Sequence, residues 1–314
     1  MKSRSRKITA LIATFTLALP HAASGSDPLV FEPSSPWVLN YADDSCQLAR
    51  TFGKGQNQIG LRIEQFQPGD SFDLILTGQF QPLLLRPRGG SMFRPTPSFP
   101  EESLPKVNVA FGTLPVQEVE VEQGELDEQG ALYISTIRIR PLSDEIKKES
   151  ARLAKEDLPL PDLPTVPAVD YEAATNLSVI TRREAFVLET GSLQPGFSAM
   201  KTCLEELTTH WGIDVGAHRT LRSRARPKPQ SNSGSFYPRG AVGRINGVVA
   251  VRVSVSAEGK PTACHIQASS DPRAFAENTC REIMASQEFE PAIAADGSPI
   301  ASYYISRWHY RTLQ

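Results

Sequence analysis

The placement of four cysteines constrains the fold of this chain more than any other feature. Cys264 and Cys280 flank the stretch "CHIQASSDPRAFAENTC", with His265 beside the first, and Cys46 and Cys203 lie far upstream. Such residues can be metal ligands, reactive thiols or disulfide partners, and an even count in an exported chain favours disulfides. The destination of the chain therefore has to be argued first, from its N-terminal residues.

The N-terminus has the order of a secretory signal peptide. A basic segment at 2–7 precedes an apolar run at 8–19, and small residues follow at 22–25. This order is typical of a cleavable export signal, which we expect to occupy residues 1–25. The apolar run is shorter than the roughly 20 residues that cross a bilayer as a helix. We therefore predict an exported protein, and the alternative is an uncleaved inner-membrane anchor.

Between residues 27 and 215 the pattern predicts a mostly-β domain. In "QIGLRIEQF", Ile59, Leu61 and Ile63 alternate with glycine or polar residues, and "SFDLILTG" repeats the alternation after the turn "QPGD". Alternation with a period of two indicates half-buried strands. A polar helix is expected to begin near Ser143, because two acidic residues follow it. We attach this domain to no named family.

The same region closes with a predicted helix that carries a cysteine. In "PGFSAMKTCLEELTTHWG", apolar residues recur at helical spacing from Phe197 to Trp211, and Gly212 is a natural stop. Cys203 lies beside this apolar face. Cys46 is the only other cysteine of the region, so we expect a Cys46–Cys203 disulfide.

Residues 216–235 are expected to form a basic interdomain linker. The segment "GAHRTLRSRARPKPQSNSGSF" has almost no apolar periodicity, which favours a solvated tether. The alternative is a patch that binds an anionic polymer of the envelope. Its cationic residues are Arg219, Arg222, Arg224, Arg226 and Lys228.

The C-terminal residues predict a small sheet that begins with a hairpin. In "GVVAVRVSVSAEGKP", four valines from Val249 to Val255 share one face, and Arg252 and its neighbours share the other. This pattern is typical of a half-buried strand. Gly259 suits the positive φ of a turn, and a second strand is expected at about 262–268.

The period of that second strand decides where its cysteine points. Cys264, Ile266 and Ala268 share one face, which Ile266 marks as the buried one. His265 and Gln267 share the opposite face. We therefore expect the Cys264 side chain to point into the core and the His265 imidazole to point away from it.

A helix is expected at about 272–286, and its single apolar side must pack on the sheet. Cys280 lies on that side, so it meets Cys264, which predicts a disulfide between helix and strand. A zinc site needs about four convergent ligands, and a reactive thiol needs exposure; both remain as alternatives. The apolar side consists of Phe275, Ala276, Cys280, Ile283 and Met284.

A closing strand is expected at 302–310, after a turn at Asp296 and Gly297. Aromatic residues occur on both faces of this strand, so its orientation is ambiguous from the pattern alone. We expect the helix-facing residues to be Tyr304 and Trp308. The outward-facing residues are then Tyr303, Ile305 and Arg307.

Four motifs occur in order near the C-terminus: "YPRGAV", "INGVVAVRVSVSAEGKP", "ASSDPRAF" and "FEPAIAADGSPI". Together they resemble the C-terminal domain of the energy-transducing protein TonB, over about residues 236–314. The resemblance implies a three-stranded antiparallel sheet with a helix packed on one face. It also implies binding of the "TonB box" of outer-membrane receptors, which is added as a strand beside the last strand.

The resemblance further implies a set of partner-binding residues. An exposed sheet edge offers unpaired backbone groups, which give affinity without requiring particular side chains. The residues carried over are Ser302, Tyr303, Tyr304, Ile305, Ser306, Arg307, Trp308 and, before the Tyr-Pro pair, Phe236. The implied partner is a TonB-dependent outer-membrane receptor or another envelope protein, and the implied location is the periplasm.

The rest of the chain departs from the transducers of that family. The resemblance implies an uncleaved transmembrane helix and a long proline-rich spacer, whereas this chain has a predicted cleavable signal and a predicted folded, disulfide-bearing domain. A protein released from the inner membrane cannot transmit force from it, so we expect binding without energy transduction. The expected fold is α+β: a mostly-β N-terminal domain that ends in a helix, then a TonB-type domain.

Enzyme motifs are scarce. The sequence lacks HExxH, GxSxG and a P-loop, and no nucleophile is spaced with a base and an orienting acid. We therefore predict no catalytic residue, no cofactor and no metal site. A net charge of −2 creates no field that would attract nucleic acid.

Other functions stay open as alternatives. One is an envelope enzyme with its active site in the N-terminal domain, which a pocket with convergent titratable groups would favour. Another is a TonB-like domain that serves as a dimerisation element. The segment "LRPRGGSMFRP" is expected to be an exposed loop, although Arg86, Arg88 and Arg94 could cradle an anion.

Overall fold

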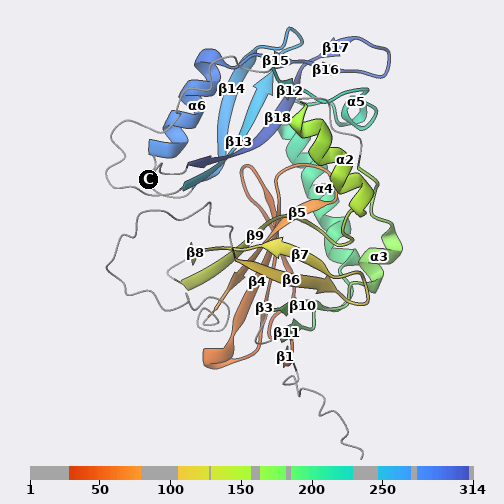
Figure 1. Ribbon diagram of the computed structural model, residues 1–314, viewed down its shortest axis with the longest axis vertical. Coiled ribbons are helices and arrows are strands. Elements are labelled where there is room, and N and C mark those ends of the chain that lie inside the picture. Colours follow the sequence, from red (N-terminus) through yellow and green to blue (C-terminus); the bar gives the residue numbers. More distant parts are fainter. Residues whose placement is uncertain are drawn as a thin grey trace, which may run out of the picture.

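The computed structural model describes residues 28–78, 105–126, 129–156, 163–181, 185–228, 247–269 and 274–310. In Figure 1 the N-terminal residues form the lower unit and residues 247–310 form the upper unit. The expected signal peptide, the loop with Arg86, Arg88 and Arg94, and Phe236 lie outside the described residues. Many strands combine with a few helices, which confirms the α+β class.

Two sheets build the N-terminal domain. The first has the order β2-β3-β4-β5-β9-β8, and the second has the order β1-β11-β10-β6-β7, in which β1 and β11 run parallel. The strands of the first sheet are β2 (Val38–Tyr41), β3 (Cys46–Phe52), β4 (Ile59–Gln65), β5 (Ser71–Thr77), β8 (Glu122–Leu126) and β9 (Gln129–Arg138). Those of the second are β1 (Leu29–Phe31), β6 (Lys106–Phe111), β7 (Gln117–Glu120), β10 (Leu177–Ile180) and β11 (Ala185–Leu188).

The two sheets share one hydrophobic core. In β4, Leu61 and Ile63 are buried, whereas Arg62 between them is only partly covered, as the two-residue period of a strand requires. Phe72 of the first sheet packs against Phe111 of the second, with 5.9 Å between ring centroids. The alternation predicted for these strands is confirmed.

Helix α4 (Gln194–His210) closes this core and is bonded to it covalently. Cys203 forms a disulfide with Cys46 at the start of β3, and both residues are fully buried. Gly196 allows the close approach of helix and strand, because a Cβ there would lie 2.5 Å from Leu48. The predicted Cys46–Cys203 bond is confirmed.

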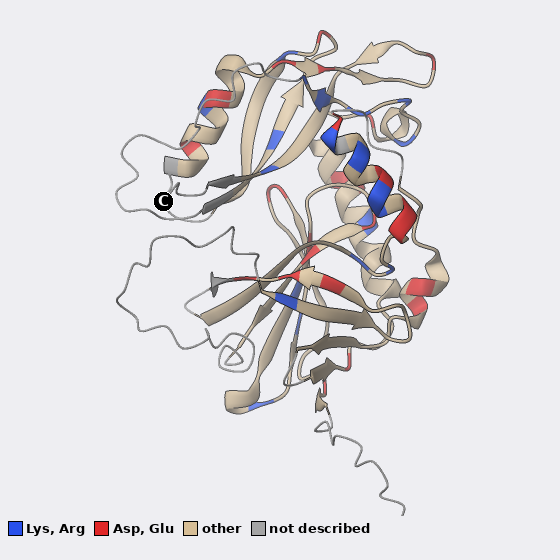
Figure 2. Cartoon of the chain, viewed as in Figure 1, with Lys and Arg blue, Asp and Glu red and all other residues tan. Residues whose placement is uncertain are grey.

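Two shorter helices precede α4. They are α2 (Asp144–Lys155) and α3 (Ala168–Ala173). Figure 2 shows basic and acidic residues side by side along α2, and Arg152 pairs there with Glu149 and Glu156. The polar helix expected after Ser143 is therefore present.

The C-terminal unit is a three-stranded antiparallel sheet with a helix on one face. The strand order is β14-β13-β18, and α6 packs against the valine face of β13. A disulfide joins Cys264 to Cys280, and none of the four cysteines is free, so the metal and reactive-thiol alternatives are wrong. The elements are β13 (Gly247–Val255), β14 (Pro261–Ser269), α6 (Ala274–Ser286), β15 (Phe289–Glu290), β16 (Ala292–Ile293), β17 (Pro299–Ile300) and β18 (Ser302–Tyr310).

The outer strand β14 departs from the strict alternation that was predicted. A register shift pairs Ala250 with Ala268 but Val251 with Ile266, so Ala268 changes face. Ile266 is 37% exposed and Met284 of α6 is 40% exposed. Ile266 lies on β14, which is an edge strand and therefore has a strand neighbour on one side only. The predicted burial of these two side chains is wrong.

Part of the segment expected to be a linker is folded. Helix α5 (Val215–Arg219) follows the N-terminal domain, and β12 (Arg226–Pro227) pairs with β15. Leu221 and Ala225 pack into the core of the C-terminal unit. Residues 216–228 are therefore not a solvated tether, because these two apolar side chains and the backbone pairing anchor them.

Candidate partner-binding site

Strand β18 lies at one border of the C-terminal sheet (Figure 1). It pairs with β13 along its whole length, from Ser302 opposite Val255 to Tyr310 opposite Gly247. Among the residues that the structure describes, β13 is its sole strand partner. Every second residue of an edge strand turns its N–H and C=O away from its neighbour. Within the described residues, the second edge of β18 therefore carries backbone groups that no strand pairs with.

One face of β18 packs against the core beneath α6. Tyr304 contacts Phe289, with 5.6 Å between ring centroids, and Trp308 packs against the same apolar cluster. Ser306 stands between them, opposite the buried Val251. The predicted inward orientation of Tyr304 and Trp308 is confirmed, and it fixes the strand from this side.

The other face of β18 is covered by the N-terminal domain. Tyr303 is only 6% exposed, and its ring contacts Trp211, which follows α4, at a centroid distance of 5.4 Å. Arg307 forms an ion pair with Asp73 of β5, and Ile305 between them is partly buried. These side chains do point away from α6, but the expectation that they face outward is wrong. The N-terminal domain lies where solvent was expected.

A buried arginine stands at the centre of this domain contact. Arg252 of β13 is 5% exposed, and its Nη2 donates to Asp44 Oδ1 at 3.1 Å. Its guanidinium also lies 4.1 Å from the ring centroid of Trp211, within the range of a cation–π interaction. Gln267 Nε2 donates to the backbone oxygen of Asp44 at 3.1 Å. The C-terminal sheet thus supplies the cations and the N-terminal domain the carboxylates.

His218 of α5 connects the start of β18 to the N-terminal side. Its Nδ1 donates to Asp214 O at 3.0 Å, so its Nε2 accepts from Ser302 Oγ at 2.7 Å when the ring is neutral. The ring also stacks on Tyr303, with 5.7 Å between centroids and 8° between planes. Burial, with a contribution from Arg224, lowers the pKa of His218. Burial is also the main cause that raises the pKa of Tyr303, so both side chains favour their neutral forms.

The sequence placed β18 correctly but missed the residues that lie against it. Asp44 and Asp73 belong to no motif, Trp211 was assigned to the helix face, and His218 to the linker. The pattern of β18 gave no sign of them, since they are far from it in the chain. The binding roles of residues 302–308 and of Phe236 stay predictions.

Residues 233–312 match the family described as Gram-negative bacterial TonB protein C-terminal. The C-terminal unit is a TonB C-terminal domain. The match does not extend over the N-terminal domain, and a comparison with curated proteins found no match. The TonB domain indicates an envelope protein with a transport-related function. In the described parts of the chain, no helix is long and apolar enough to cross a membrane.

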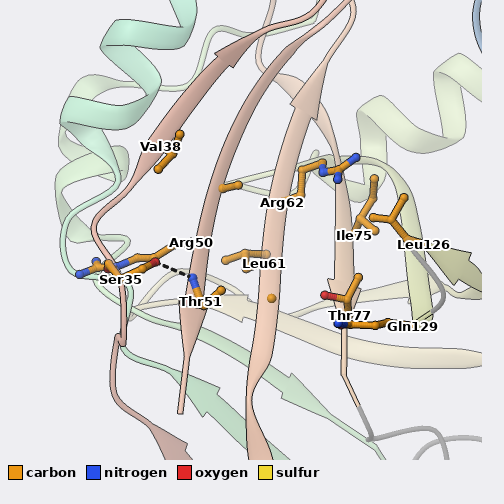
Figure 3. Close-up of a pocket in the computed structure, with 12 residues that line it drawn as sticks. Ser35, Val38, Arg50, Thr51, Leu61, Arg62, Ile75, Thr77, Leu126 and Gln129 are labelled. Carbon is orange, nitrogen blue, oxygen red and sulfur yellow. Dashed lines mark hydrogen bonds between the residues drawn. The ribbon is translucent and has the colours of Figure 1, made fainter. Parts of the chain in front are cut away.

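A partly open hollow with a volume of about 260 Å³ lies on the first sheet of the N-terminal domain. Figure 3 shows Arg62, Ile75 and Leu126 on one side of it and Val38 on the other. The described residues of its walls include no carboxylate, imidazole or thiol; they are Ser35, Val38, Ala49, Arg50, Thr51, Gly60, Leu61, Arg62, Ile75, Thr77, Leu126 and Gln129.

The chemistry of this hollow does not favour the enzyme alternative. Arg50 is engaged, because its Nη1 donates to Thr190 O at 2.9 Å and its Nε to Ser35 O at 2.8 Å. Activation of a hydroxyl nucleophile needs an adjacent base, and the described lining residues include no histidine, aspartate or glutamate. Among the described residues, no group of three or more His, Cys, Asp or Glu side chains is arranged to hold a metal ion. That the protein is not an enzyme stays a prediction.

Proposed function

We propose that this protein is an exported envelope protein whose TonB domain binds an extended segment of a partner by adding it as a strand beside β18. The observation that carries the proposal is the border position of β18, which pairs with β13 alone among the described residues. The partner is a TonB-dependent outer-membrane receptor or another envelope protein. The proposal includes a cleavable signal at 1–25 and a periplasmic location, and it assigns no catalytic residue and no cofactor.

The physics of such binding suits this strand. Each backbone hydrogen bond to the added strand contributes about 1 kcal/mol net, so several in a row give useful affinity. Tyr304 and Trp308 on one face and Tyr303 and Arg307 on the other hold β18 in place. Because β18 is already ordered, the strand itself loses little conformational entropy when a partner binds.

A pair of neighbouring proline substitutions tests the proposal. Ile305→Pro and Ser306→Pro each remove one N–H, but in an antiparallel ladder one of the two amides points to β13 and the other points outward. The variant whose lost amide points to β13 loses a ladder bond and has a destabilised sheet. The variant whose lost amide points outward keeps the ladder intact and is expected to bind a TonB-box peptide about tenfold or more weakly than wild type.

The comparison within the pair provides the control. The variant with the higher melting temperature is the one to titrate, using the mature full chain and a receptor-derived TonB-box peptide. Unchanged peptide affinity in that variant would contradict strand addition at β18. A stable dimer of the wild-type chain that the same proline dissociates would favour the dimerisation alternative instead.

A further inference from the structure

The contact between the two domains is built from different groups than either core. Two ion pairs between described residues of the domains, Arg252 with Asp44 and Arg307 with Asp73, both take the cation from the TonB domain and the carboxylate from the N-terminal domain. Aromatic packing between Trp211 and Tyr303 adds to them. Contacts of this composition resemble those between proteins that associate reversibly.

Within the described residues, hydrogen bonding in this contact is incomplete. Three buried polar atoms there, Arg252 Nε, Gln267 Oε1 and Trp211 Nε1, have no hydrogen-bond partner among those residues. Buried polar atoms of folded cores are nearly always paired, and leaving one unpaired costs free energy. A contact with three such atoms holds the domains together less strongly than one in which every buried polar atom is paired.

These contacts converge on the strand that forms the candidate site. Ser302 bonds His218, Tyr303 packs between His218 and Trp211, and Arg307 pairs with Asp73. The end of α4 and helix α5 therefore lie against the start of β18. An added strand points every second side chain toward this same face, so it needs space beside the groups that hold the domains together.

We propose that these contacts form an interdomain latch, made by Asp44, Asp73, Trp211 and His218 on one side and Arg252, Ser302, Tyr303 and Arg307 on the other. The latch is closed in this structure, and its release opens the N-terminal face of β18. Partner binding and release are coupled, because the partner binds more tightly to the open form. This inference rests on the function proposed above.

A double substitution tests the latch in the mature full-length chain. Asp44→Asn with Asp73→Asn removes both interdomain charges but keeps oxygen acceptors, including the Asp73 Oδ1 that accepts from Thr136 N. The population of the open form is expected to rise at least about tenfold. Small-angle scattering then shows a larger radius of gyration, and hydrogen exchange shows faster exchange at Tyr303 and Arg307. Peptide affinity rises with the open population, up to the point where the open form predominates.

A matched control removes two carboxylates from ion pairs elsewhere. Glu118→Gln with Glu149→Gln eliminates the exposed pairs with Lys106 and Arg152, and it should leave scattering, exchange and affinity unchanged. If the double Asn variant folds poorly, Arg307→Gln breaks one pair from the other domain and should give a smaller change in the same direction.

The measurements separate the latch from the proposed function. Scattering and exchange are recorded without peptide, and a double variant that stays as compact and protected as wild type overturns the latch, whatever the peptide does. A variant that opens but binds peptide no better than wild type overturns the coupling. Failure of both proteins to bind a TonB-box peptide counts against the proposed function, while the peptide-free measurements still decide the latch.

Discussion

The two faces of the TonB sheet are both buried, but by opposite chemistry. On the α6 face, Val249, Val251 and Val253 pack against Phe275, and the Cys264–Cys280 disulfide ties helix to sheet. On the other face, Arg252, Tyr303 and Arg307 meet carboxylates and rings of the N-terminal domain. Similar burial therefore corresponds to different functions: the first face holds the domain together, and the second holds two domains to each other.

This difference teaches that burial alone does not identify a folding core. Apolar burial stabilises in proportion to the area removed from water, whereas a buried ion pair gains little because desolvation offsets much of its attraction. Changes on the α6 face should therefore unfold the TonB domain. Changes on the other face should separate the domains and leave each one folded. The following predictions test that contrast, from the largest effect to the smallest.

Truncation on the α6 face should have the largest effect. Phe275 is fully buried, and Phe275→Ala is expected to destabilise the TonB domain by about 3–5 kcal/mol, because it removes apolar contacts and leaves a cavity. Urea denaturation followed by hydrogen exchange mass spectrometry measures each domain separately. Met284→Ala, at a site 40% exposed on the same helix, is the control and should cost less than about 1 kcal/mol. Equal losses in both variants would contradict the assignment of this face as the core.

Removal of the disulfide on the same face should come next. Cys264→Ala with Cys280→Ala opens a loop with a sequence separation of 16 residues, which corresponds to about 3 kcal/mol in the chain-entropy model. The measurement is again urea denaturation of the TonB domain, while the N-terminal domain retains its Cys46–Cys203 bond. An unchanged midpoint would show that the helix is held by packing alone.

A substitution on the N-terminal face should weaken the domain contact and spare the TonB core. Arg252→Met keeps most of the apolar stem but leaves the Asp44 carboxylate without its cation, at a cost of about 1–3 kcal/mol to the contact. Small-angle scattering should show partial separation, while exchange of the β13 amides stays slow. If the β13 amides of Arg252→Met lost as much protection from exchange as those of Phe275→Ala, the proposed difference between the two faces would be contradicted.

A pH effect at His218 should be the smallest. Burial lowers the pKa of this imidazole below the usual 6.5, so the closed contact favours the neutral ring. Its contribution is therefore complete above about pH 6.5 and is lost as the pH falls below that value. After correction for the intrinsic rate, hydrogen exchange at Ser302 and Tyr303 should become faster as the pH falls from 7.5 to 5.5.

The control for this effect is a second histidine. His218→Gln should remove this part of the pH dependence, whereas His210→Gln, at the exposed end of α4, should retain it. A wild-type protein whose β18 exchange, corrected for the intrinsic rate, is the same at both pH values would contradict the account of His218.

Local patterns in the sequence predicted much of the fold. The two-residue period of β4 and β13 predicts strands, and the helical spacing before Gly212 predicts the closing helix. Alternation in β14 places Cys264 on the face toward α6, which predicts its bond to Cys280. The Cys46–Cys203 bond followed because Cys46 is the only other cysteine of the N-terminal region. These features depend on neighbours in the chain. The bounds of β18 follow for the same reason.

The domain contact could not be predicted in this way. Alternation in β13 indicates a polar face, but it does not distinguish water from the carboxylates of another domain. Asp44 and Asp73 are separated from their arginines by most of the chain, so no local pattern connects them. The folding of residues 216–228 was missed similarly, because a basic segment with two apolar anchors, Leu221 and Ala225, has no visible period.

Residue-resolved hydrogen exchange of the mature chain, with and without a saturating TonB-box peptide, tests the central proposal most directly. The opposite border strand β14 serves as an internal control in the same sheet. Strand addition at β18 predicts that amides of every second residue between Ser302 and Tyr310 become protected, while those of β14 do not change. Protection along β14 instead, or no protection on either strand, would contradict it.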